Sequence, residues 1–129
     1  MRSDLLTAIT ANTAFTSNCT VSSELPWDSG GSPLYINNKK HFYLSAENKD
    51  VTELFSCLDS TDIMQTETTL NGYLTVDAKN QPSDIDTIVA NVLLARTTIA
   101  NTTNSESSVT IGIEDDYITY EFLYRFITV

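Results

Sequence analysis

The sequence has few of the residues from which active sites and cofactor sites are built. One histidine, two cysteines and four glycines are spread over 129 residues. A Ser-His-Asp or Cys-His arrangement would have to use His41, and no nucleophile motif surrounds any partner for it, Cys57 included. Gly30-Gly31 is followed by Ser32-Pro33 and not by a helix, so no phosphate-binding loop is expected there. We therefore expect no catalytic residue, no cofactor and no enzyme activity.

Basic residues are scarce as well. Seven lysines and arginines stand against 17 aspartates and glutamates, which gives a formal net charge of -10. Nucleic acid is a polyanion whose tight binding needs clustered positive charge, and the only basic pair is Lys39-Lys40. We expect no tight binding to DNA or to an anionic membrane. The excess of acid fits solubility, or a surface past which DNA moves without sticking.

Long apolar runs are also missing. No stretch approaches the roughly 20 apolar residues that a membrane-spanning helix needs. Asp4 stands where a signal peptide would continue into an apolar segment, so we expect no secretion by that route. Cys19 and Cys57 form no CxxC pair; reduced thiols are the favoured interpretation, and a disulfide stays open.

What is present suffices for one domain over residues 1–129. Hydrophobic residues make up 41% of the chain, enough for one modest core, whereas two separate cores would be too small at this length. We expect one short helix that is capped by Ser3 and ends between Ala11 and Phe15, and a second from Ser83, again as cap, to about Ile99. The second helix carries an apolar stripe at helical spacing, Ile85, Ile88, Val89, Val92 and Leu93.

Alternating apolar and polar residues predict strands around these helices. The predicted strands are 20–21, 34–36, 41–44, 64–79, 109–113 and 117–129. Residues 51–58 fit either a strand or a short helix. We expect turns at 37–38, 46–50, 59–62 and 114–116, and a mobile polar loop over 101–108. The predicted fold class is α+β, with a mainly antiparallel sheet of four to six strands flanked by two helices.

Three features of the pattern point to contacts or special backbone. Gly72 interrupts the apolar side of strand 64–79, which indicates a bulge or a close approach of backbone. Trp27 lies on a loop rich in glycine and proline, where it is either an interface anchor or a lid on the domain's own core. Glu114, Asp115 and Asp116 form an acidic turn that is either simply solvated or a weak site for a divalent cation.

The last predicted strand has two apolar faces. One face carries Tyr120, Phe122, Tyr124 and Phe126, which are either the domain's own core or a contact surface. The candidate interface residues on the opposite face are Leu123, Arg125, Ile127 and Val129. Thirteen residues at about 3.3 Å each span roughly 43 Å, which is long for a domain of this size. We therefore expect this strand to project beyond its core and to meet another subunit.

Three stretches carry a resemblance to a known family: Thr68 to Pro82, Asp84 to Val89 and Tyr120 to Phe126. Together with the order helix, strands, capped helix and final hairpin, they resemble the tail terminator (tail completion) proteins of tailed bacteriophages over residues 4–129. The loop around Trp27 has no counterpart in that pattern.

The resemblance implies a homo-oligomeric ring, usually a hexamer, that is assembled in the host cytoplasm and located in the tail and neck of the virion. Such a ring caps the tail tube, stops its growth and joins the tail to the neck. Its partners would be the tail tube protein and a head-tail connector or neck protein, with DNA passing through without tight binding. Glu114, Asp115 and Asp116 are then candidates for its lumen or rim. Two alternatives stay open: a head-tail connector or neck adaptor, and a small non-catalytic protein-binding module.

Overall fold

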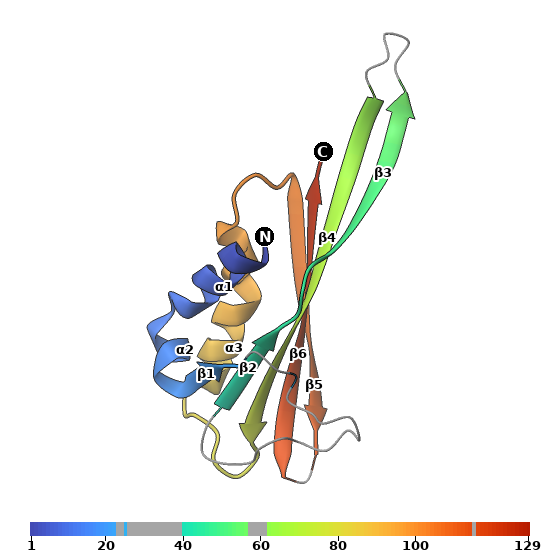
Figure 1. Ribbon diagram of the computed structural model, residues 1–129. Helices are drawn as coiled ribbons and strands as arrows, with labels where there is room; N and C mark the ends of the chain where they lie inside the picture. Colours follow the sequence, from blue (N-terminus) through green and yellow to red (C-terminus); the bar gives the residue numbers. More distant parts are fainter. Residues whose placement is uncertain (23–24, 26–39, 57–61, 115) are drawn as a thin grey trace.

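A computed structural model describes residues 1–22, 25, 40–56, 62–114 and 116–129 of the chain. Over these residues three α-helices lie against one face of a six-stranded, mostly antiparallel sheet (Figure 1), which confirms the predicted α+β class. The elements in chain order are α1 (Arg2–Thr10), α2 (Thr13–Asn18), β1 (Cys19–Val21), β2 (Lys40–Leu44), β3 (Asn48–Ser56), β4 (Asp62–Asp77), α3 (Ile85–Leu94), the 3-10 helix η1 (Ala95–Thr98), β5 (Asn104–Ile113) and β6 (Tyr117–Thr128).

β4 is the central strand, and at 16 residues it is also the longest of the described strands. One of its edges pairs with β6 from Thr66 to Asp77. Its other edge pairs with two strands in succession, β3 over 62–69 and β2 over 72–75. The parallel strand β1 beside β2, and the antiparallel strand β5 beside β6, complete the order β1-β2-β4-β6-β5.

A short break separates β2 from β3, and its backbone groups are satisfied from two sides. Ser45 forms hydrogen bonds with both backbone groups of Asn71. Its N–H donates to the Asn71 carbonyl at 2.8 Å, and its Oγ accepts from the Asn71 N–H at 2.9 Å. The Arg2 guanidinium donates to the carbonyls of Leu44 and Ser45 at 2.9 to 3.1 Å. Buried polar groups need such partners. Beyond this break, β3 and β4 continue together away from the helices (Figure 1).

The core lies between the helices and one face of the sheet. Phe122, Tyr124 and Phe126 of β6 are fully buried there, so the aromatic face of this strand belongs to the domain's own core. Phe42 packs edge-to-face on Phe15 of α2 and on Phe122, with ring centroids 5.5 and 6.3 Å apart. The helices contribute the buried residues Leu5, Ile9, Ile88, Val92 and Ala95. Full burial of one such aliphatic or aromatic side chain contributes about 1.5–3 kcal/mol.

Gly72 lies beneath the ring of Phe42. A Cβ atom at this position would come within 3.0 Å of Phe42 Cζ, and the pairing of β4 with β6 runs through Gly72 without a shift in register. The pairing with β6 shows no bulge at Gly72, and the group that comes close is the aromatic side chain of Phe42, not backbone as predicted.

The helix starts differ from the predicted caps. The Leu5 N–H bonds to the Met1 carbonyl at 3.0 Å, so α1 begins two residues earlier than predicted and Ser3 lies inside it. The chain then breaks after Thr10 and starts a second helix, α2. In α3 the N-cap is Asp84, because Pro82 and Ile85 form a turn through a 3.2 Å backbone bond; Ser83 is not the cap. The helical conformation continues through η1 to Thr98, close to the predicted end.

Two polar segments that were expected to be turns or loops are strands. Residues 48–50 belong to β3 and pair with 67–69 of β4, so the predicted turn at 46–50 is wrong beyond its first two residues. Residues 104–108 belong to β5 and pair with β6, so the polar loop at 101–108 is wrong beyond Thr103. In both cases a ladder with a neighbouring strand outweighs weak local strand propensity. Of the open alternatives for 51–58, the strand is correct through Ser56. The predicted strand 34–36, the turn at 37–38 and residues 59–61 lie outside the described residues.

Candidate interaction surfaces

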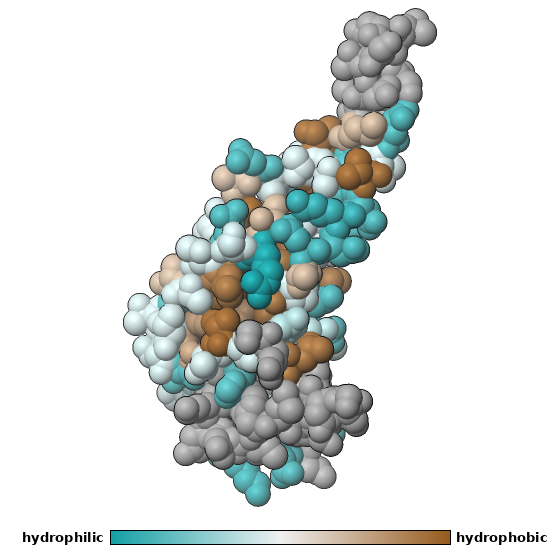
Figure 2. All heavy atoms as spheres, in the orientation of Figure 1, coloured by the Kyte–Doolittle hydropathy of each residue, from teal (hydrophilic) through white to brown (hydrophobic). Residues whose placement is uncertain are grey.

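The β3–β4 hairpin extends past the end of β6 and forms a projection that we call the arm, residues 51–56 and 62–66. The last pair between β4 and β6 joins Thr66 to Thr128, so beyond Thr66 the two strands of the arm pair only with each other within the described residues. Val51 is 65% exposed, and Leu54 and Met64 are also exposed. Figure 2 shows hydrophobic atoms on the arm where it leaves the body. An isolated two-stranded hairpin is at best marginally stable in water.

The position of the arm corrects the expectation for the last strand. β6 is paired with β4 over residues 117–128 and with β5 over 118–127, so β6 does not project beyond its core. The strand that projects is β4, which is four residues longer than the 12-residue β6 and is accompanied by β3. The prediction of a projecting strand was placed on the wrong element, because the partner strands determine how much of a long strand is covered.

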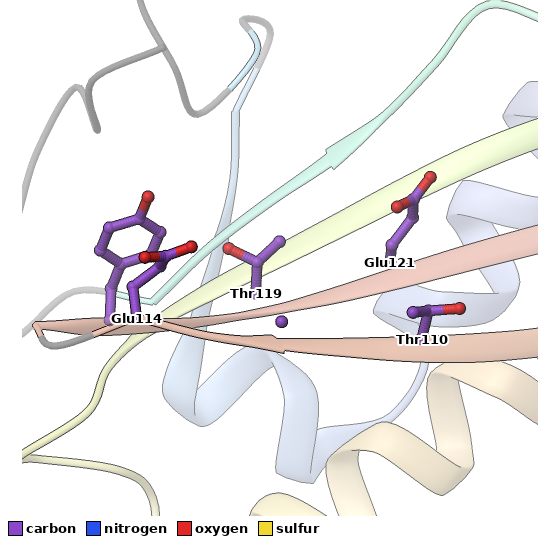
Figure 3. A pocket seen from close by; sticks show the side chains of 6 residues that line it. Thr110, Glu114, Thr119 and Glu121 are labelled. Carbon is purple, nitrogen blue, oxygen red and sulfur yellow. The ribbon is translucent and has the colours of Figure 1, made fainter.

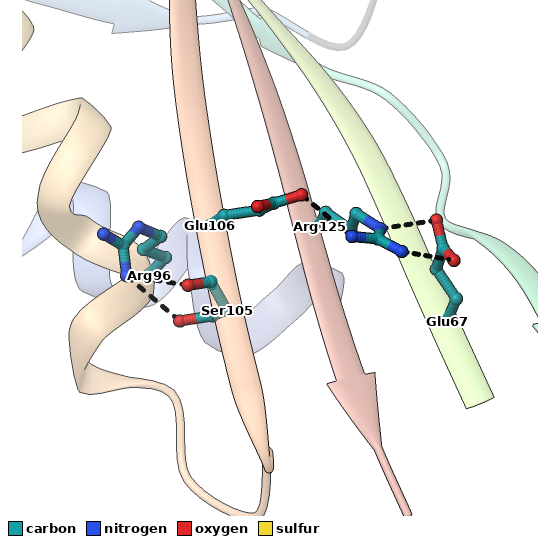
Figure 4. A network of polar contacts seen from close by, with 5 residues as sticks. All are labelled: Glu67, Arg96, Ser105, Glu106 and Arg125. Carbon is teal, nitrogen blue, oxygen red and sulfur yellow. Dashed lines mark hydrogen bonds and ion pairs between the residues drawn. The ribbon is translucent and has the colours of Figure 1, made fainter. Parts of the chain in front are cut away.

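β5 forms the border of the sheet opposite β3, and its free side is only partly closed. The Glu114 N–H bonds to the Tyr117 carbonyl at 2.9 Å, and from this bond the alternation of an antiparallel ladder directs the backbone groups of 105, 107, 109, 111 and 113 away from β6. Arg96 Nη1 donates to the outward Ser105 carbonyl at 3.2 Å (Figure 4), and Arg96 Nε donates to Ser107 Oγ at 2.8 Å. These contacts close the upper half of the border.

The lower half of that border, residues 109–113, we call the open edge. Within the described part of the chain, these residues pair with β6 alone. Ile111 is 54% exposed and Ile113 is 75% exposed. No charge and no proline occurs from 107 to 113, and the register with β6 is continuous. Natural proteins usually protect a border strand with lysines, prolines or bulges, and the open edge has none of these.

Arg125 links three strands on the face of the sheet that the helices leave open. Its Nε and Nη2 donate to the two carboxylate oxygens of Glu67 on β4 at 2.8 and 3.1 Å, and its Nη1 donates to Glu106 on β5 at 3.0 Å (Figure 4). The Arg125 hydrogen bond holds the pKa of the Glu67 carboxyl below its usual value. The predicted interface residue Arg125 therefore already has partners within its own chain. Beside it lies the exposed Leu123, in a depression of about 390 Å³.

A second depression, of about 230 Å³, lies near the β5–β6 turn (Figure 3). Its lining residues are Thr110, Gly112, Glu114, Tyr117, Thr119 and Glu121. The Thr119 hydroxyl is buried and has no hydrogen-bond partner. Within the described residues, no three His, Cys, Asp or Glu side chains come together as metal ligands. Asp115 of the acidic turn lies outside these residues, and the divalent-cation alternative stays a prediction.

The remaining predicted residues fall at separate places. Leu123, Arg125 and Ile127 share the open face of β6, and Val129 is exposed at the chain end. Glu114 and Asp116 are exposed at the opposite end of β6. His41 is half-buried on β2 opposite Thr75. Trp27, Cys57 and Asp115 lie outside the described residues.

Sequence reasoning missed the apolar residues of the arm and of the open edge. The signal for the arm was present, because residues 51–58 carry apolar side chains on both alternating faces. A strand with two apolar faces in a polar neighbourhood needs a cover on both sides. Ile111 and Ile113 were assigned to a strand, but their place at the border depends on the order of strands, which the sequence does not show.

No model of a protein family matches the chain, and no curated protein matches it significantly. None of the described helices is long and apolar enough to span a membrane.

Proposed function

We propose that this protein is a structural subunit that assembles with copies of itself into a ring, in the manner of a phage tail terminator. The observation that carries the proposal is the arm, which exposes Val51, Leu54 and Met64 on two strands that, beyond Thr66, have no third strand beside them among the described residues. Covering one such side chain fully contributes about 1.5–3 kcal/mol. A subunit that projects unsupported apolar strand is stabilised when another chain covers it.

The unlike borders on the two sides of the sheet favour a ring over a closed pair. On one side the border strands are β1, beside β2, and β3, which carries Lys49, Asp50 and Glu53; on the other side the border is formed by β5 and carries the open edge. Unlike surfaces that meet head-to-tail generate rings when the rotation closes. The number of subunits, six by resemblance, belongs to the proposal.

The charge of the chain supports a ring through which DNA passes. The net charge is -10, and the open face of the sheet carries Glu67, Glu106 and Glu121, with Glu114 and Asp116 at its end. A negatively charged wall repels a polyanion and does not hold it. In this role the ring ends the tail tube in the virion, contacts the tail tube protein on one side and a connector or neck protein on the other, and is assembled in the host cytoplasm.

Light scattering after size exclusion, combined with negative-stain imaging, tests the proposal. The 14.3-kDa chain should give a discrete oligomer, six copies being expected, with a central hole in the images. Added tail tubes should carry the ring at one end, and duplex DNA should not be retained at about 0.15 M salt, where a basic binder would still hold it. A monomer at every concentration that also leaves tail tubes unchanged would overturn the proposal and favour the protein-binding module.

A further inference from the structure

We propose that β3 of one copy adds to the open edge of β5 in the next copy, so that the sheet becomes continuous around the assembly. This inference rests on the proposed ring and specifies the joint between its subunits. The occupant of the open edge is a second copy of this chain.

Strand direction suits this joint. β3 and β6 both run antiparallel to β4, and β5 runs antiparallel to β6, so β3 and β5 run in opposite directions within one chain. A rotation about an axis along the strands keeps these directions. β3 of one copy therefore meets β5 of the next as an antiparallel pair, without inversion of either subunit, and antiparallel pairs have the more favourable ladder.

Val51, at the base of the arm on β3, lies on the helix side of the sheet. Lys49 pairs with Thr68, which is buried with Leu70 under the helices, so Lys49 and Val51 face that side. The intervening Asp50 pairs with Glu67 and faces the open side.

The apolar residues of the open edge lie on the same side. Ile111 pairs with Tyr120 and Ile113 pairs with Ile118, and both partners are buried residues of the core face. Ser108 and Thr110 face the open side. Any joint with an even offset thus places Val51 beside the apolar residues of β5 and Asp50 beside its polar ones.

The offset between copies is compatible with a closed wall. Pairing runs from Asp50 through Glu67 and Ile127 to Asn104, so Asp50 and Asn104 lie at one level. Pairing Asp50 with Thr110 of the next copy shifts the copies by six residues, about 20 Å, over four strands that are about 19 Å wide. The corresponding strand tilt is about 46°, close to the ~35–45° of closed barrels.

Other occupants of the open edge fit less well. Two β5 borders would meet symmetrically and close a pair, which would leave both arms uncovered. Two β3 borders would bring Lys49, Asp50 and Glu53 of one copy against the same charges of the other, next to the shift in register between Glu53 and Phe55. Only the unlike pair brings β3 to the open edge. When Asp50 pairs with Thr110, Val51 lies beside Val109 and Lys49 beside Ile111 of the next copy.

Two blocked variants and their mixture test the joint. Ile111→Pro removes an N–H that points away from β6, so it closes the open edge without loss of a bond inside the chain; Ile111→Lys is the second variant for this site. Val51→Asp places an acid between Asp50 and Glu53 and blocks the arm. Leu94→Lys is the matched control. Leu94 on α3 is 52% exposed, nearly the same fraction as Ile111, and it lies on neither border of the sheet.

Each blocked variant should stay folded, with a cooperative melting transition, and remain a monomer by light scattering, while Leu94→Lys assembles normally. An equimolar mixture of Ile111→Pro and Val51→Asp should form a dimer and no larger species, because one working joint remains between the two chains. If the wild type forms a ring and Ile111→Pro and Ile111→Lys each form the same ring, the proposed joint is wrong but the proposed ring stands. A mixture that stays monomeric would overturn the arm as the occupant. A wild type that never assembles would overturn the ring itself.

Discussion

Arg125 and Glu67 form the best-defined polar contact on the open face of the sheet. The Arg125 guanidinium binds both oxygens of the Glu67 carboxylate, and this contact lowers the pKa of Glu67 below its usual 4.5. A carboxyl with a lower pKa in the folded state adds stability that is fully present above the unfolded-state pKa. That stability is lost as the pH falls through the lower folded-state pKa.

Glu67→Gln should therefore reduce the loss of stability on acidification. Urea unfolding over about pH 3 to 7, at a concentration where the mass is constant, should show a flatter acid limb for the variant than for the wild type. Glu106→Gln is the control, because Glu106 makes one contact with Arg125 and is the more exposed of the two. Equal acid limbs for Glu67→Gln and the wild type would show that the contact does not form in solution.

At the scale of single residues, the sequence showed position better than geometry. It singled out Gly72 as a special position but not the reason for it, which is the aromatic ring of Phe42 packed on this glycine. It also singled out Arg125 as an interface residue. The nearest partners of Arg125 are Glu67 and Glu106, 58 and 19 residues away, and no spacing rule finds such distant pairs.

α3 is fixed to the sheet by one buried hydrogen bond in addition to its apolar stripe. The Tyr124 hydroxyl donates to the Val92 carbonyl at 2.6 Å, and burial raises the pKa of this hydroxyl. The stripe was correctly predicted: Ile88 and Val92 are buried, and Ile85, Val89 and Leu93 pack partly against the core. The hydroxyl of Tyr124 at the end of this contact fixes the helix along the strand.

Tyr124→Phe should lower the free energy of unfolding by about 1 kcal/mol, because the aromatic packing is kept and one buried hydrogen bond is lost. Urea unfolding measures the change. Tyr120→Phe on the same face is the matched control, since no hydrogen bond of its hydroxyl is described, and its effect should be smaller. If both variants lose the same stability, the bond to Val92 contributes nothing specific.

At the scale of elements, local sequence patterns predicted the helices and strands whose periodicity is visible in a short window. The apolar stripe of α3 and the alternation in β4 and β6 appear in short windows of sequence. β3 and the first half of β5 do not, because 48–50 and 104–108 are polar segments that become strands only beside β4 and β6. The helix caps failed for the same reason. Contacts such as that of Arg2 with the β2–β3 break decide where α1 starts, and they come from distant parts of the chain.

The whole molecule consists of a body and an arm, and the arm is separable in principle. β6 pairs with β4 only from Thr66 onward, and Val51 pairs with Thr66. A two-residue Asn-Gly turn in place of 52–65 would therefore close the hairpin at the end of the body. Such a variant leaves the core residues of the body unchanged.

The arm-shortened chain should unfold at nearly the same temperature as the wild-type monomer and should not assemble. Differential scanning calorimetry and light scattering measure the two properties. The reason is that the described side chains of the arm, at 51–54 and 64–66, contribute exposed apolar area and no buried core residue. An arm-shortened chain that still gave rings would show that the subunits meet through other surfaces.

The unlike borders of the sheet have a consequence for how copies accumulate. A row of joined copies always ends in one vacant β3 border and one vacant β5 border, however many copies it contains. Adding copies to the row never removes these two vacant borders. They disappear only when the β3 border at one end pairs with the β5 border at the other. Incomplete rows should thus associate with other chains more readily than the closed ring, which exposes neither vacant border to solvent.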